Sequence, residues 1–344
     1  MNQQDTPANL LAGTLHGEKC YRTPCICPGG MMNMLTLEAM DLCDTYWPEA
    51  HRDPVLMARL AAAPFAAGLF DNIGVPFCMT VEAEAMGSTV DLGDRQTEPR
   101  VTAYAISSVQ QWDKLSPVTL DQGRAKVVLD ALTLIRAQYP QAAVIGNLTG
   151  PISLASSLVD ANAFYKELRK RPQAAHALMD FITDNLIAFG KAQIQAGAEF
   201  IAISDPSGTG EILGPRLFEE YALPCLNRLC QALRPLCRGV IVHICGQLRA
   251  IYPQLSLLES DAISVDAAVS LEKLRENVPE KVVMGNVSTF ALAAGKSDTI
   301  RSLCRSCLRS GADILAPACG LGTTTALSSI RILMETVKEA TDAN

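Results

Sequence analysis

Short and almost uninterrupted apolar runs alternate with longer amphipathic segments from about residue 142 to residue 320. Such runs are typical of strands that are covered on both faces, and the segments between some of them, most clearly 162–198 and 288–312, have helical spacing. Strand and helix in alternation predict right-handed parallel crossovers. The six expected strands are 142–150, 198–208, 238–246, 260–268, 281–288 and 312–320.

Two earlier segments, 22–30 and 72–80, can supply further strands, although each contains proline, which lacks a backbone donor. Eight strands close a (β/α)8 barrel. A chain of 344 residues holds the usual core of about 250 residues and an N-terminal extension. We therefore predict an α/β fold, a (β/α)8 TIM barrel. An open doubly wound sheet is the alternative, and it fits less well because no Gly-x-Gly-x-x-Gly turn follows an early strand.

The domain organisation follows from this fold. We expect residues 1–344 to form a single barrel domain, with residues 1–20 as an N-terminal extension. The stretch from about 87 to 122 is the least periodic part of the chain and contains a segment typical of turns or a hairpin. We predict that it is an insertion near the barrel mouth.

Composition excludes some partners and locations. The net charge of -7 leaves no basic stripe for phosphates, so nucleic acid is an unexpected partner. The longest apolar stretch, 56–70, is interrupted by Arg59 and Pro64, and it is shorter than the roughly 20 residues of a membrane span. The N-terminus has no apolar core of signal-peptide length. We therefore expect a cytoplasmic protein without a membrane span, and its twelve cysteines are expected to be free thiols.

Polar residues at the carboxyl ends of the expected strands are the first candidates for function, because these ends surround the active site of a barrel. On a strand, residues two apart point to the same face, so His243 and Cys245 present an imidazole and a sulfur side by side. Cys319 stands at the end of the last expected strand. The full set is Asn147, Ser204, Asp205, His243, Cys245, Asp266, Asn286, Ser288 and Cys319.

Barrel closure can bring Cys319 to the same point as the His243 and Cys245 pair. One histidine and two cysteines with a fourth position open are typical of a catalytic zinc site, since structural sites are normally closed by four protein ligands. The alternative is ordinary core packing, which is the commoner role of an isolated His-x-Cys pair.

The remaining cysteines and histidines support no second site. Cys304 and Cys307 form a C-x-x-C on an amphipathic helical segment, where packing is the expected role. His16 and His51 lie in polar, turn-like contexts. A Gly-x-Ser-x-Gly nucleophile elbow and a P-loop are both absent from the sequence.

The segments "VIVHICG", "VVMGNVS" and "DILAPACGLG" resemble the uroporphyrinogen decarboxylase-like superfamily, and within it the zinc-dependent methylcobamide:coenzyme M methyltransferase branch. The resemblance covers nearly the whole chain, and the His-x-Cys pair with a distant Cys-Gly is its most specific mark. The decarboxylases of this superfamily carry an arginine-rich N-terminal motif that binds substrate carboxylates. Here that region has the single Arg22, which disfavours porphyrin decarboxylation.

The resemblance implies a barrel in which His243, Cys245 and Cys319 hold Zn²⁺ and a small thiol acceptor takes the fourth position. It also implies a methylcorrinoid (cobalamin) donor. The sequence has no Asp-x-His-x-x-Gly motif, so the corrinoid is expected on a separate carrier protein. Asp266 could fill the open position before the thiol binds, and the alternative is a helix cap.

Four further residues have open roles. Asp205 is a second candidate catalytic residue, and Asn147, Ser204 and Asn286 are candidate substrate-binding residues, with helix capping again the alternative for Asp205, Asn147 and Asn286. A metal-independent decarboxylase and a non-catalytic corrinoid or tetrapyrrole-binding protein are the competing functions. Coenzyme M, another thiol or a folate all stay open as the acceptor, as do the original methyl donor and the oligomeric state.

Overall fold

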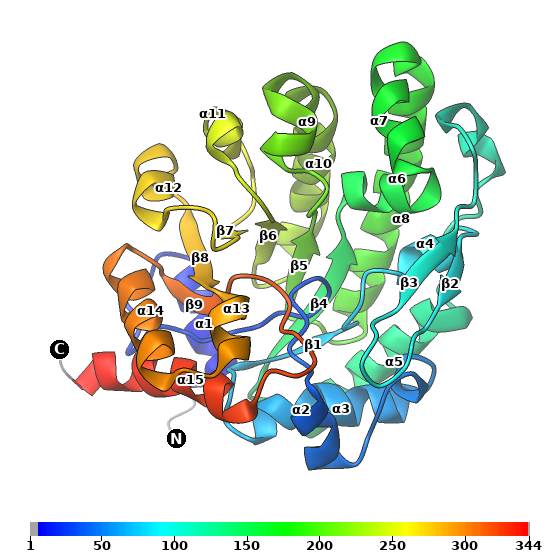
Figure 1. Cartoon of the computed structure of the whole chain (residues 1–344). Coiled ribbons are helices and arrows are strands. Elements are labelled where there is room, and N and C mark those ends of the chain that lie inside the picture. Colours follow the sequence, from blue (N-terminus) through cyan, green and yellow to red (C-terminus); the bar gives the residue numbers. More distant parts are fainter. Residues whose placement is uncertain (1–5, 343–344) are drawn as a thin grey trace.

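A computed structural model gives the structure of the chain and describes residues 6–342. Its centre is a seven-stranded parallel sheet in which every strand pairs with the next one along the chain, so that the sheet curls into a barrel (Figure 1). This is the (β/α)8-type architecture that the apolar runs predicted. The strands are β1 (Asn72–Val75), β4 (Ala143–Thr149), β5 (Phe200–Ser204), β6 (Val240–Ile244), β7 (Ala262–Val265), β8 (Val282–Val287) and β9 (Ile314–Pro317).

The first expected strand, residues 22–30, is a correction to the prediction of eight strands. It makes one isolated parallel bridge, between Cys25 and β9, and no regular ladder. On its other side, side chains make some of the hydrogen bonds that a ladder would make. The Cys25 N–H donates to Asp71 Oδ2 and the Cys27 N–H donates to Asn72 Oδ1, both at 2.8 Å. Prolines on either side of this short segment remove further donors, which explains the missing strand.

The same segment nevertheless closes the barrel between β9 and β1. The Ile26 N–H donates to the Leu315 carbonyl at 3.1 Å, and the Leu315 N–H donates to the Pro24 carbonyl at 2.9 Å. On the other side, a Cβ added to Gly74 of β1 would lie 1.6 Å from the carbonyl oxygen of Pro28. Only glycine permits this approach of the two backbones. The curled sheet and this segment therefore form a barrel together, and the sheet is not an open doubly wound one.

Helices follow the strands and form the outer layer of the barrel (Figure 1). The helical segment expected at 162–198 is split in two at Pro172, which occupies the first position of the second helix. No helix among residues 6–342 is long and apolar enough to cross a membrane. The helices are α1 (Pro7–Leu15), α2 (Leu37–Cys43), α3 (Pro54–Ala66), α4 (Val81–Ala85), α5 (Gly123–Gln138), α6 (Pro151–Leu158), α7 (Ala161–Lys170), α8 (Pro172–Gln195), α9 (Gly210–Leu217), α10 (Leu223–Leu233), α11 (Tyr252–Leu255), α12 (Leu271–Asn277), α13 (Thr289–Ala294), α14 (Ser297–Arg309) and α15 (Leu327–Asp342).

A hairpin stands apart from the barrel sheet, within the stretch 87–122. Its strands, β2 (Thr89–Asp91) and β3 (Arg100–Ala103), pair antiparallel. The connection between them reaches back to the barrel, because Thr323 Oγ1 donates to the Gln96 carbonyl at 3.3 Å and Asn33 Nδ2 donates to Glu98 Oε1 at 2.9 Å. The hairpin thus lies against the loop that follows β9.

Candidate metal centre

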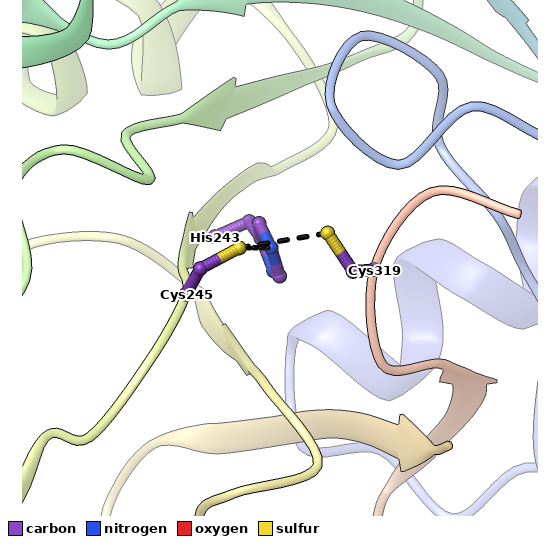
Figure 2. A group of neighbouring side chains, drawn as sticks. All are labelled: His243, Cys245 and Cys319. Carbon is purple, nitrogen blue, oxygen red and sulfur yellow. Dashed lines mark hydrogen bonds between the residues drawn. The ribbon is translucent and has the colours of Figure 1, made fainter. Parts of the chain in front are cut away.

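Three side chains from two distant parts of the chain meet at the carboxyl ends of β6 and β9 (Figure 2). His243 Nε2 lies 3.0 Å from Cys245 Sγ, and Cys245 Sγ lies 3.5 Å from Cys319 Sγ. One ligand atom from each residue falls within 4.8 Å of the other two. Ligand atoms of a tetrahedral zinc site are separated by about 3.5 to 3.8 Å, as follows from Zn–N and Zn–S bond lengths of about 2.0 and 2.3 Å. The observed spacing fits such a site.

Local structure explains why these residues converge. His243 is the fourth residue of β6, and Cys245 follows the strand directly, so the period of two places both on the same side. Cys319 lies on the loop after β9. That loop contacts the N-terminal segment, which we define as residues 22–33. The Leu321 N–H donates to the Asn33 carbonyl at 2.8 Å. A Cβ on Gly320 would lie 2.5 Å from the Met31 carbonyl oxygen, so only glycine fits beside Cys319.

Ser264 of β7 contacts the imidazole of His243 at Nδ1, the ring nitrogen other than the one near Cys245. Its Oγ lies 2.9 Å from His243 Nδ1, in the strand register that pairs His243 with Ser264. His243 is only 1% exposed and Ser264 is fully buried. Sequence reasoning missed Ser264, although it is the one polar residue within the run Ala262–Val265. Metal-bound histidines usually have such an outer partner on the second ring nitrogen.

The two thiols are coupled through their hydrogen bond. That bond, more than burial, raises the pKa of Cys245, and the Asp266 carboxylate raises it further. The same bond lowers the pKa of Cys319 against the opposing effect of burial. The pair thus retains one proton between two sulfurs after the first proton leaves. A divalent cation would displace this second proton, because coordinated thiols are deprotonated.

The donor set fits Zn²⁺ in its chemistry as well as in its spacing. Imidazole nitrogen and thiolate sulfur are ligands that zinc prefers, whereas Mg²⁺ and Ca²⁺ prefer oxygen. With three protein ligands, the fourth tetrahedral position is open to an exchangeable group. The arrangement can therefore hold a metal-bound thiol.

Asp266 lies beside this cluster, on the loop that follows β7. Its Oδ1 accepts a hydrogen bond from the Ala268 N–H at 2.8 Å, so it stabilises a turn, and the cap of the following helix α12 is Ser270. Asn286 holds the same loop, because its Nδ2 donates to the carbonyls of Asp266 and Val269 at 2.8 and 2.9 Å. Asn286 therefore fixes the position of the loop that carries Asp266.

Asp205 has a different environment. It is fully buried, and its carboxylate accepts hydrogen bonds from the Ile152 N–H at 3.2 Å and from the Ser153 N–H and hydroxyl at 2.8 and 2.7 Å. Burial raises its pKa, and the bonds from Ser153 oppose that shift. Asp205 therefore caps α6, the helix after the neighbouring strand β4. This geometry matches the capping alternative, on a different helix from the one expected.

Asn147 and Ser204 are also buried. Asn147 Nδ2 donates to the carbonyls of Pro28 and Val75, at 2.9 and 3.2 Å, and ties the N-terminal segment to β1. Its Oδ1 has no hydrogen-bond partner among the described residues. Ser204 ends β5 in register with His243, and its carbonyl accepts from the Gly150 N–H at 2.7 Å.

Glu98 is a second residue that sequence reasoning missed. It lies on the hairpin connection and accepts a hydrogen bond from Asn33, whose backbone contacts the residues after Cys319. Burial raises the pKa of Glu98, and Cys319 raises it further. The only sequence signal for it was its place in the irregular stretch 87–122.

Cys304, Cys307 and His51 are buried and are not part of the metal centre. Cys304 and Cys307 are buried on α14, and burial raises the pKa of both thiols. His51 ends the short 3-10 helix Glu49–His51, as its turn-like context predicted, but its surroundings are not polar. Its ring is fully buried between Trp47 and Phe77, at ring-centre distances of 5.5 and 5.0 Å. Burial lowers the pKa of His51 to about 3.

Comparison with known proteins identifies the family of the chain. The family described as uroporphyrinogen decarboxylase (URO-D) matches residues 6–340. The methylcobamide:CoM methyltransferase MtbA of Methanosarcina acetivorans is 30% identical over 97% of this chain and 98% of its own length. The methylcobamide:CoM methyltransferase MtaA of Methanosarcina barkeri is 31% identical, with 97% and 98% covered.

A solved methyltransferase from Methanosarcina mazei has the same fold, with a TM-score of 0.90 and 29% sequence identity. The similarity covers 97% of this chain and 99% of that one. The family match extends over nearly all the described residues. The chain therefore belongs to the uroporphyrinogen decarboxylase (URO-D) family, within which it is similar to the methylcobamide:CoM methyltransferases.

Proposed function

We propose that this protein is a corrinoid-dependent methyltransferase that moves a methyl group from a methylcorrinoid to a thiol, with coenzyme M as the first candidate acceptor. The observation that carries this proposal is the cluster of His243, Cys245 and Cys319 at the barrel mouth, with its three ligand atoms within 4.8 Å of one another. The relatives described as methylcobamide:CoM methyltransferases support the same activity.

The reaction is a nucleophilic displacement. The acceptor thiol loses its proton, its sulfur attacks the methyl carbon, the S–C bond forms, and the Co–C bond breaks with its electron pair staying on cobalt, which becomes Co(I). Zn²⁺ held by His243, Cys245 and Cys319 would keep the acceptor sulfur as a thiolate at neutral pH, where a free thiol of pKa about 8.5 is mostly protonated. The two protein thiolates would already neutralise the dication, so charge would stay on the incoming sulfur.

The residues around the cluster position it. Asp266 can occupy the open position before the thiol arrives, and its loop is held in place by Asn286 through two hydrogen bonds. The barrel mouth is also supported by three buried residues, Asp205, Asn147 and Ser204. Their proposed contribution is to keep α6 and the N-terminal segment in place around the acceptor.

The methylcorrinoid is proposed to arrive on a separate carrier protein, because the sequence has no Asp-x-His-x-x-Gly motif of a corrinoid-binding module. A carrier must cover the barrel mouth to bring its methyl group to the cluster. Phe290 is a suitable anchor. It is 88% exposed, on the short helix α13 that starts directly after the carboxyl end of β8. Exposed aromatic residues are frequent energetic centres of protein interfaces.

A decarboxylase of the parent type is less well supported. Arg22, the one arginine of the N-terminal segment, is bound by the carboxylate of Asp71 at two points, with N–O distances of 2.5 and 2.8 Å. This pairing leaves the guanidinium little capacity for substrate carboxylates. A non-catalytic corrinoid-binding protein would have no need of the three metal-ligand residues His243, Cys245 and Cys319. The reducing cytoplasm is the proposed location of the protein, and there its twelve cysteines are expected to stay free thiols.

The experiment that tests the proposed function is a turnover assay with free methylcobalamin and a panel of acceptors: coenzyme M, homocysteine, cysteine and tetrahydrofolate. Transfer to a thiol is expected, visible as loss of the methylcobalamin spectrum and as the methylated thiol by mass spectrometry. Turnover with tetrahydrofolate alone, or no turnover with zinc-loaded protein, would reject the proposed acceptor chemistry. Evolution of carbon dioxide from a porphyrinogen would support the decarboxylase.

A further inference from the structure

The hydroxyl of Ser264 lies between two groups that determine how it can hydrogen bond. On one side is His243 Nδ1 at 2.9 Å, and on the other is the thioether sulfur of Met32 at 3.4 Å. The Met32 sulfur carries no hydrogen and can only accept. These two contacts are the hydrogen bonds that the structure gives this hydroxyl within residues 6–342.

One hydrogen cannot serve both neighbours. When the hydroxyl donates to the Met32 sulfur, its oxygen is free to accept, and His243 Nδ1 must then carry the ring hydrogen. The lone pair of the neutral ring is consequently on Nε2, which is the nitrogen that faces Cys245 Sγ at 3.0 Å. In the opposite arrangement the hydroxyl donates to Nδ1, the ring hydrogen sits on Nε2, and that nitrogen must lose its hydrogen before it can bind a metal.

Met32 is itself firmly placed, so the choice between the two arrangements does not depend on a mobile side chain. It is 1% exposed, and its carbonyl accepts hydrogen bonds from the Gly29 N–H at 3.0 Å and from the Cys27 thiol at 3.1 Å. Ser264 is fully buried in β7. Since both residues are shielded from solvent, bulk water does not compete with the Met32 sulfur for the hydroxyl.

We propose that the Met32–Ser264 pair selects the Nδ1–H form of His243 and so prepares Nε2 as a metal ligand before any metal binds. Ser264 and Met32 are thus positioning residues that act through His243. This inference rests on the metal site of the proposed function. It adds a role for the N-terminal segment, which joins the barrel without forming a regular strand and supplies the acceptor on which the arrangement depends.

The first test measures zinc affinity by competition with a chromophoric chelator. Ser264→Ala removes both hydrogen bonds, and we expect Zn²⁺ to bind about 10- to 100-fold more weakly than to the wild type, as for other outer partners of metal-bound histidines. Met32→Leu keeps the size of the side chain but removes the acceptor, so a smaller loss is expected. The matched control is Ser260→Ala, which removes a buried hydroxyl without a described partner, just ahead of the same strand, and should leave zinc affinity unchanged.

A combined variant separates positioning from packing. If Met32 acts through Ser264, then Met32→Leu should cause no further loss of zinc affinity once Ser264→Ala is present. Losses that simply multiply would contradict the proposal. So would Ser264→Ala with wild-type zinc affinity, provided that the wild type binds zinc. A wild type without zinc affinity would instead reject the metal site itself, and this inference with it.

The second test needs no metal and does not depend on activity. The ¹⁵N chemical shifts of the histidine rings in metal-free protein distinguish the two ring forms, and with four histidines in the chain the His243 signals can be assigned from a His243→Gln variant. The wild type should show the Nδ1–H form, and Met32→Leu and Ser264→Ala should show a mixture. An Nε2–H ring in the metal-free wild type would overturn the proposal.

Discussion

Replacement of Asp205 distinguishes a structural from a catalytic carboxylate at the barrel mouth. Asp205→Ala would leave the N–H groups of Ile152 and Ser153 and the Ser153 hydroxyl without the acceptor that now lies 2.7 to 3.2 Å away. Each of these three losses costs about 1 to 1.7 kcal/mol in a buried site, so a destabilisation of about 3 to 5 kcal/mol is expected. With an unfolding entropy of about 0.7 kcal/mol/K for a chain of this length, Tm should fall by about 4 to 7 °C.

The assay combines calorimetry with thiol-dependent demethylation of methylcobalamin. Asp205→Asn keeps one oxygen to accept from Ser153, so it should lose less stability and retain most of the activity. Asp160→Ala is the matched control, since Asp160 caps α7 from an exposed position through the Ala163 N–H, and it should cost only about 1 kcal/mol. If Asp205→Ala keeps the wild-type Tm but loses activity at constant zinc content, the structural role of Asp205 is wrong.

Two further predictions concern pH and the carrier. The folded chain holds the pKa of His51 near 3, below the ordinary 6.5 of the unfolded chain, so the unfolded state binds more protons and stability is lost as pH falls from 6.5 towards 3. At pH 5 this loss is about 2 kcal/mol. Denaturant titrations of His51→Leu should therefore depend less on pH in this range, and an exposed-site control, His16→Gln, should retain the wild-type slope. Phe290→Ala should raise KM for the carrier-bound methylcorrinoid by about tenfold and leave turnover of free methylcobalamin unchanged. Leu257→Ala, at a 58% exposed site before β7, should affect neither; an equal effect of both substitutions would remove Phe290 from the interface.

The sequence was sufficient for the barrel because continuous apolar runs and helical spacing are local signals. It was also sufficient to name His243 and Cys245, since the period of two along a strand places them together without any tertiary information. The convergence of Cys319 followed from the assumption of a closed barrel and from the family resemblance. Closure itself depends on Asp71 and Asn72, whose side chains replace part of a backbone ladder beside the N-terminal segment. No local sequence pattern predicts such a replacement.

Tertiary contacts account for the features that sequence reasoning did not foresee. Asp205 resembled a catalytic residue at a strand end, yet it caps a helix that belongs to the neighbouring strand. His51 looked polar from its neighbours in the sequence, but its ring is enclosed by Trp47 and Phe77. Ser264 gained its importance from His243 and from a methionine more than two hundred positions earlier in the chain. Such contacts exist only in the folded protein.

The central claim is that His243, Cys245 and Cys319 bind one zinc ion and that this ion activates a thiol. The most direct measurement is the zinc content of the purified protein, taken together with thiol-dependent demethylation of methylcobalamin, for the wild type and for Cys245→Ala. About one zinc per chain in the wild type is expected, with loss of both metal and activity in the variant. A Cys245→Ala protein that lacks zinc and still demethylates methylcobalamin at the wild-type rate would contradict the account.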